Sequence, residues 1–93
     1  MNDERILTMH PAGKQGVNMH RDRYEFIKIY LLETIKAAGE ITFSDLGDKA
    51  VDEISLKFDG KVLWYITTVK LDLEARKLIE RIPKTSPQIL RLT

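Results

Sequence analysis

The sequence predicts a small α+β domain, mostly helical, in which an amino-terminal arm and three helices precede a two-stranded hairpin. Hydrophobic residues recur at helical spacing in three segments between residues 20 and 76. After Arg76 the pattern changes to two short strand-like runs around a turn that holds Pro83 and Pro87. The 93 residues suit one compact domain. We therefore expect an arm or short hairpin over 1–19, a three-helix core over 20–76 and the hairpin over 77–93.

The amino-acid composition indicates the cellular compartment in which the protein is expected. The sequence contains no cysteine, so neither disulfides nor thiolate metal sites hold the fold together. This fits a reducing cytoplasm, where we expect the protein. No apolar run approaches the roughly 18 residues that a membrane span needs. The polar first four residues lack a signal-peptide pattern, and we expect no membrane partner.

Charge is distributed unevenly along the chain, although the net charge is only +1. Residues 37–75 carry four basic and eight acidic side chains, so this segment has a net charge of −4. Residues 76–93 carry five basic side chains against Glu80 alone, so this segment has a net charge of +4. The positive charge therefore lies at the end of the third helix and on the hairpin, where it serves either phosphate binding or the solubility of a strand edge.

The first half of the chain contains the arm and two helices. Residues 5–9 form a strand-like run before a turn-rich stretch over 10–16. We expect the first helix to start near His20 or Arg21, after a possible cap at Asn18, and to end near Ala38, before Gly39. Thr42 and Asp45 form a start signal for a second helix that ends near Ile54. Its inward residues should be Leu46, Ala50 and Ile54, and an Asp59-Gly60 turn follows.

The third helix is expected over residues 61–76. At about 100° per residue, one face gathers Val62, Ile66, Val69 and Leu73, which should meet the other two helices. Trp64 and Leu71 fall nearly opposite. A helix that is apolar on two faces is usually covered on both. We therefore expect the arm, the sheet or a second subunit to cover Trp64 and Leu71.

The hairpin has two predicted strands, over residues 78–82 and 88–92. Ile79 and Ile82 cannot both face inward on a regular strand, so a bulge or an early strand end is expected. Pro83 and Pro87 fit strand ends, where a missing amide donor does no harm.

A helix followed by such a hairpin is the closing half of a winged helix-turn-helix domain, and we call residues 77–93 the wing. Residues 73–81, LEARKLIER, resemble the junction of recognition helix and wing in regulators of the MarR and PadR kind. The chain departs from that pattern at Lys77, where glycine is usual, so a less sharply turned helix end is expected. As a whole, the chain resembles an uncharacterised bacterial family of small single-domain winged-helix proteins. The features that carry this resemblance are the segments 13–18 and 69–76, Trp64-Tyr65 and Pro87-Gln88.

The first functional hypothesis is DNA binding by a transcriptional regulator. Recognition helices read base edges in the major groove of double-stranded DNA, while basic wings hold phosphates. Thr67 and Lys70 are the candidate readers. The acidic Asp72 and Glu74 on the same helix count against strong affinity. The candidate phosphate contacts are Arg81, Lys84 and Arg91.

The alternative hypothesis is a non-enzymatic protein-interaction or dimerisation module. Trp64 and Leu71 would then anchor the interface, because aromatic residues are enriched at interface centres. The competing interpretation is that Trp64 is covered by its own chain, for example by Met9 or Val17, because small domains need large apolar groups in the core.

An enzyme is not expected. His10 and His20 are the only histidines, and neither lies in a metal-ligand spacing. The glycines of segment 13–16 lack the spacing of a phosphate-binding loop. The sequence indicates no catalytic residue, cofactor, metal or small-molecule substrate.

Overall fold

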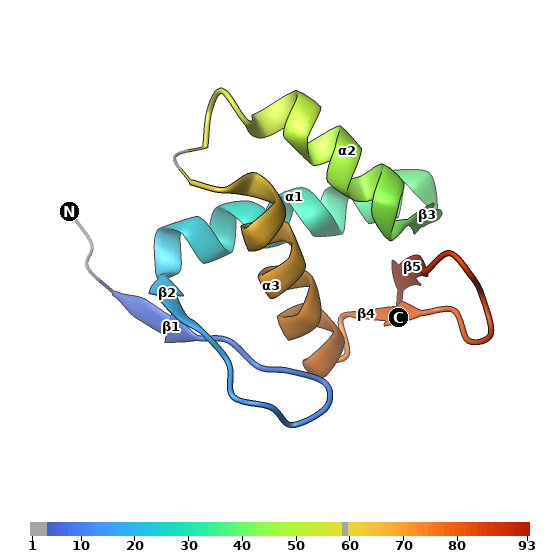
Figure 1. Ribbon diagram of the computed structural model, residues 1–93, viewed down its shortest axis with the longest axis horizontal. Coiled ribbons are helices and arrows are strands. Elements are labelled where there is room, and N and C mark those ends of the chain that lie inside the picture. Colours follow the sequence, from blue (N-terminus) through green and yellow to red (C-terminus); the bar gives the residue numbers. More distant parts are fainter. Residues whose placement is uncertain (1–3, 59) are drawn as a thin grey trace.

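The computed structural model describes residues 4–58 and 60–93, so Asp59, a predicted turn residue, lies outside the described part. An arm hairpin precedes three helices, and a small sheet gathers strands from two parts of the chain (Figure 1). The elements are β1 (Arg5–Leu7), β2 (Asn18–His20), α1 (Arg21–Ala38), β3 (Glu40–Thr42), α2 (Phe43–Ile54), α3 (Val62–Ala75), β4 (Ile79–Arg81) and β5 (Ile89–Leu92).

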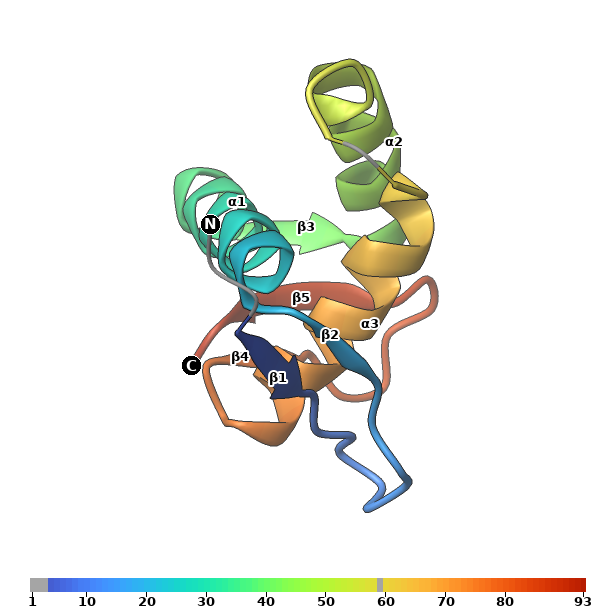
Figure 2. The same ribbon diagram turned by 90° about the vertical axis from the view of Figure 1, so that its left-hand side faces the viewer.

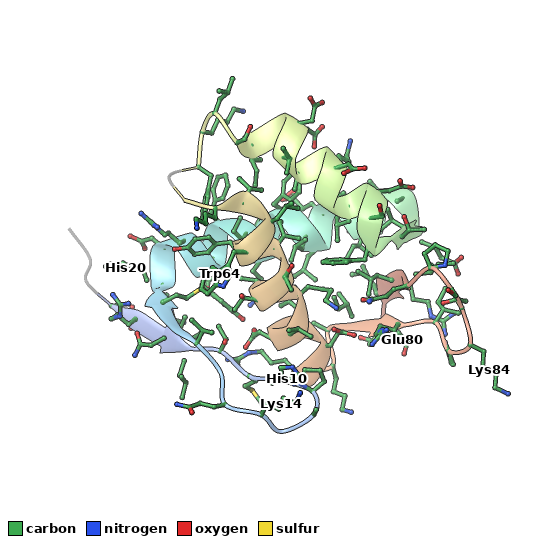
Figure 3. The ribbon with its side chains drawn as sticks, in the orientation of Figure 1. His10, Lys14, His20, Trp64, Glu80 and Lys84 are labelled. Atoms are coloured by element: carbon green, nitrogen blue, oxygen red, sulfur yellow. The ribbon has the colours of Figure 1, made fainter. Side chains whose placement is uncertain are left out.

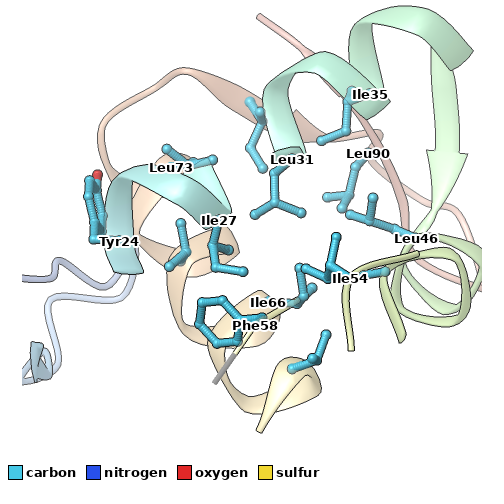
Figure 4. Close-up of a cluster of buried hydrophobic side chains, with 14 of the residues drawn as sticks. Tyr24, Ile27, Leu31, Ile35, Leu46, Ile54, Phe58, Ile66, Leu73 and Leu90 are labelled. Carbon is cyan, nitrogen blue, oxygen red and sulfur yellow. The ribbon is translucent and has the colours of Figure 1, made fainter. Parts of the chain in front are cut away.

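The three helices enclose one hydrophobic core, shown in Figure 4. The faces predicted from helical spacing are the buried ones on α2 and α3, and α1 contributes Tyr24, Ile27, Leu31 and Ile35. Leu90 of β5 is fully buried against them. The inward residues predicted for the second and third helices are therefore confirmed.

The sheet differs from the predicted two-stranded hairpin. β5 lies in the middle, with β4 on one side and β3 on the other, and both pairings are antiparallel. Strand β3 was missed because the helix-start signal at Thr42 masked the short extended segment that ends at this residue. The early strand end is confirmed: β4 stops at Arg81, with Ile79 buried and Ile82 only partly buried.

The arm is an ordered hairpin. Strands β1 and β2 pair antiparallel, with Ile6 opposite Met19. The Thr8 amide donates to the Val17 carbonyl over 2.9 Å, and a side chain at Gly16 would place its Cβ 1.6 Å from the Thr8 carbonyl oxygen. Glycine at position 16 is therefore required by the close approach of the two chain segments.

Helix ends follow local chemistry, with two corrections. The predicted cap at Asn18 is wrong: Asn18 lies in β2, and the N-cap of α1 is His20, whose side chain makes no capping bond. Thr42 does cap α2, because its hydroxyl accepts from the Asp45 amide over 3.0 Å. At the end of α3, Lys77 adopts φ 66°, and the Leu78 amide donates to the Leu73 carbonyl over 3.0 Å. Lys77 thus takes the left-handed conformation that glycine usually supplies, and the helix end is sharply turned after all.

The molecule presents two different sides. Figure 2 shows α3, the turn of the arm and the β4–β5 loop projecting on one side, while α1 lies on the opposite side. Among the described residues, no helix is both long and apolar enough to cross a membrane.

Candidate interaction surface

The solvent-facing surface of α3 is apolar. Leu63 is 54% exposed and Trp64 is 45% exposed, and Thr67 beside them is exposed as well. The Thr67 hydroxyl donates to the Leu63 carbonyl of the preceding turn over 2.8 Å, so it is already engaged within the helix. We call Leu63, Trp64 and Thr67 the α3 face; Figure 3 shows Trp64 near the amino-terminal end of this helix.

Trp64 is held at the edge of an aromatic group. Its ring meets that of Tyr65 edge to face, with 4.9 Å between centroids, and Tyr65 in turn meets Phe58 at 4.8 Å. Arg23 donates to the Tyr65 hydroxyl over 2.8 Å and fixes that ring. The chain therefore orients Trp64 but leaves almost half of it exposed, which counts against the interpretation that its own chain covers it.

Leu71 has a different environment. It lies half-buried beside the arm, and together with Thr68 it lines a small cavity of about 80 Å³ under residues 8–10 and 15–17. Of the three covers considered for Leu71, the arm is the one found. Leu71 is thus mainly a docking point for the arm.

Lys70 does not face solvent. It is 4% exposed, and its ammonium donates to Oε1 of Gln88 over 2.8 Å. The same ammonium lies 3.0 Å from Oε2 of Glu74 and 4.9 Å from the centroid of the Phe43 ring. It therefore ties α3 to the start of α2 and to the wing, and it is not available as a base reader in this conformation.

Asp72 is the centre of a buried polar network that the sequence did not indicate. It is fully buried and accepts from the Tyr24 hydroxyl on α1, from the Met9 amide of the arm over 2.8 Å and from Nε of Arg76 over 2.9 Å. A buried carboxylate needs such partners, because an unpaired buried charge is costly. Asp72 therefore positions the arm against α1 and α3.

The ionisation of this network follows from burial. Desolvation raises the pKa of Tyr24 well above its ordinary value, and the hydrogen bond to Asp72 adds to the effect. The pKa of Arg76 is raised as well, mainly by its hydrogen bond to Asp72. Tyr24 therefore stays neutral and Arg76 stays charged in this network.

The predicted phosphate contacts on the wing are separated by their environments. Arg91 pairs with its cross-strand neighbour Glu80, with 2.6 Å between Nε and Oε2. Arg81 and Lys84 are exposed, and neither has an ion pair with any residue that the structure describes. Lys84 lies in the turn that leaves the body of the molecule, as Figure 3 shows. Only these two of the three predicted contacts are uncommitted cations.

The two histidines lie in the arm and at the start of α1. Nδ1 of His10 accepts from the Ala12 amide over 3.0 Å, which is a turn contact within the arm. His20 precedes α1. Within residues 4–58 and 60–93, no group of three or more histidine or acidic side chains is arranged to hold a metal ion.

Residues 5–90 match the model of a family of unknown function (DUF6958), and the chain therefore belongs to that family. An uncharacterised family was expected from the resemblance noted above. Neither the curated proteins nor the solved structures contain a significant match to the chain.

Proposed function

We propose that this protein is a non-enzymatic interaction module on a winged-helix scaffold, with the α3 face as its protein-binding surface. The observation that carries the proposal is the contrast between an exposed Trp64 and a buried Lys70 on one helix. A helix that reads DNA needs polar donors directed outward, whereas the outward residues here are two large apolar side chains and an internally bonded threonine.

The surroundings of Trp64 favour this function. Interface energy concentrates in aromatic anchors near the centre of a contact, and rigid anchors lose little entropy on binding. Trp64 is oriented by Tyr65, and Leu63 lies next to it on the same surface. The partner should therefore present a small apolar patch to α3.

A peptide library displayed on phage tests the proposal with a defined probe. Peptides selected on the wild-type protein should carry hydrophobic residues, and Trp64→Ser should weaken their binding at least tenfold. Leu56→Ser is the matched control, because Leu56 is fully exposed and lies away from α3 in the turn after α2. The control should bind as the wild type does.

Two results would remove the proposal. One is a set of selected peptides that bind wild type and Trp64→Ser equally. The other is a Trp64→Ser variant that unfolds, which would make Trp64 a structural residue; the circular-dichroism melting curve checks this point before any binding is measured.

DNA binding is the second candidate, because Arg81 and Lys84 are exposed cations on the wing. A basic wing beside a helix suits phosphate contacts. The order of three helices followed by the β4–β5 hairpin supports the winged-helix scaffold, and a distant relation to MarR- and PadR-type regulators belongs to this candidate. Without Lys70, base reading would fall to Thr67, so we expect weak, sequence-independent affinity.

Fluorescence anisotropy with a duplex of random sequence tests this candidate. Affinity should fall with rising salt, because phosphate contacts release counterions. The double substitution Arg81→Ala and Lys84→Ala removes two phosphate contacts. The slope of log affinity against log salt concentration should then become shallower by about two. Absence of binding at 50 mM salt, about the low end at which such contacts are strongest, would exclude the wing as a DNA contact.

A further inference from the structure

An open groove runs along α1 and also takes in Ile41 of β3 and Lys49 of α2. Its volume is about 780 Å³. Phe26 and Ile29 line it and are 42% and 54% exposed. The remaining lining residues are Tyr30, Glu33, Thr34, Ala37, Ala38, Ile41 and Lys49.

Most of the residues that line the groove lie on α1. The lining residues on α1 recur every three or four positions from Phe26 to Ala38, so they form one continuous strip. At 1.5 Å per residue this strip is about 18 Å long, which matches the length of a second helix laid against it. A helix is therefore a better fit for this groove than a compact ligand.

We propose that the occupant is α1 of a second copy of this chain, packed antiparallel about a two-fold axis near residue 32. This surface is separate from the α3 face, and the inference does not depend on the proposed function. A two-fold contact uses the same patch on both copies, so the strip must complement itself when its direction is reversed.

The sizes of the side chains meet that condition. The bulky Phe26 lies at one end of the strip, and the small Ala37 and Ala38 lie at the other end. Reversal about residue 32 places Phe26 of each copy over the alanines of its partner. Ile29 then falls opposite Thr34, so large side chains face small ones toward both ends of the contact, while Tyr30 falls opposite Glu33 at its middle.

The charges along the outer edge of the strip also complement themselves when its direction is reversed. Glu25 lies in the first half of α1 and Lys36 lies in the last turn. The reversal brings Glu25 of one copy near Lys36 of the other, twice by symmetry. Lys36 has no ion-pair partner in the described part of its own chain, and the Arg21–Glu25 separation is 4.0 Å, at the outer limit of an ion pair. Both groups are thus available for a partner.

The groove is poorly suited to an anionic amphiphile. Lys49 is the cation among its lining residues, and its ammonium lies 3.2 Å from Glu53, which also accepts from the Tyr30 hydroxyl over 2.7 Å. A ligand carboxylate would have to displace Glu53 from Lys49. The strip therefore favours an apolar helix over a fatty acid.

Sedimentation equilibrium of the full chain tests the proposal. The contact is small, so we expect a reversible dimer with a dissociation constant in the micromolar range. Ala37→Glu places a charge in the contact on an exposed helix position, and it should weaken the dimer at least tenfold without unfolding the protein. Leu56→Glu makes the same kind of change outside the groove and should leave the dimer unchanged.

Cross-linking tests the register. The chain has no native cysteine, so Phe26→Cys and Ala37→Cys each introduce a single thiol. Under mild oxidation, a mixture of the two variants should form far more heterodimer than either variant forms disulfide-linked homodimer. A monomer at 0.5 mM, about two orders of magnitude above such a dissociation constant, would overturn the proposal.

A dimer that Trp64→Ser dissociates and Ala37→Glu does not would also overturn it. That second result would place the contact on the α3 face and would leave the proposed function standing. Failure of the two proposals can therefore be told apart.

Discussion

The ammonium of Lys70 lies 3.0 Å from Oε2 of Glu74, one turn along α3, and both side chains are almost fully buried. Oε2 of Glu74 has no hydrogen-bond donor in the structure, so the contact with Lys70 is ionic and not well directed. Gln88 accepts a proper hydrogen bond from the same ammonium. The hydrogen bond from Lys70 to Gln88 fixes the wing on the helices. The same arrangement removes the basic side chain in the middle of α3 from the exposed surface.

Lys70→Met should destabilise the fold by about 3 kcal/mol, because it leaves Glu74 buried without its partner. Urea unfolding measures the change. Lys49→Met is the matched control: Lys49 and Glu53 have the same spacing on a helix but are about half exposed, so little change is expected. Equal effects in the two variants would mean that the Lys70 pair is solvated.

Stability should fall as the pH rises above about 10, the value for an unfolded tyrosine. Burial and Asp72 raise the pKa of folded Tyr24, so the unfolded chain loses this proton first. The stabilisation is complete below pH 10, about the unfolded tyrosine value, and is lost as the pH rises toward the folded pKa. Tyr30, with its pKa raised to about 12 by burial and Glu53, acts in the same direction.

Urea midpoints measured between pH 8 and 11.5, a range chosen to bracket about pH 10, test this dependence. Tyr24→Phe removes the hydroxyl proton of Tyr24, so the stability of the variant should decline less steeply with pH than that of the wild type. The two slopes should differ by up to about 1.4 kcal/mol per pH unit. Parallel curves for the two proteins would show that Tyr24 titrates normally.

Gly16→Ala should loosen the arm, because the added Cβ would overlap the Thr8 carbonyl oxygen. We expect a loss of roughly 2 kcal/mol and faster hydrogen exchange at the Thr8 and Met9 amides. Gly13→Ala is the control: nothing lies within 4 Å of its Cβ, and only its φ of 75° is unfavourable. Gly13→Ala should lower the free energy of unfolding by about 1 kcal/mol and leave the Met9 amide protected from hydrogen exchange. Unchanged exchange in Gly16→Ala would contradict the close approach.

Lys77→Gly should stabilise the protein by up to about 1 kcal/mol, since lysine at φ 66° carries a steric cost that glycine avoids. The opposite sign is expected for Lys36→Gly in the last turn of α1, which should lose about 1 kcal/mol in the helix. Thermal unfolding at low protein concentration compares the two. Loss of stability in both variants would refute the left-handed helix end.

Local patterns predicted much of the fold. The spacing of Val62, Ile66, Val69 and Leu73 was enough to identify the buried face of α3, because burial on a helix is periodic. Strand β3 escaped prediction because three residues between two helices carry almost no periodic signal. The same limit applies to Gly16, whose neighbour Thr8 is brought close only by the pairing of the arm strands.

The candidate site depends on contacts between distant segments, and these were less predictable. Lys70 lies on a flank of α3 by its helical angle, which leaves it free to point inward or outward. Its position is decided by Phe43 and Gln88, which no local pattern connects to it. Asp72 looked like a surface acid for the same reason. The place of Trp64 opposite the core face was predicted, but its exposure was not, because the path of the arm decides which residues on that side are covered.

The fluorescence of Trp64 reports on whether a partner covers the α3 face, because Trp64 is the only tryptophan and is 45% exposed. If the α3 face is the protein-binding surface, a selected peptide should shift the emission to shorter wavelength and protect it from iodide quenching, while random-sequence duplex DNA should do neither. Protection by DNA at low salt, with no response to any selected peptide, would show that the α3 face is not a protein-binding surface.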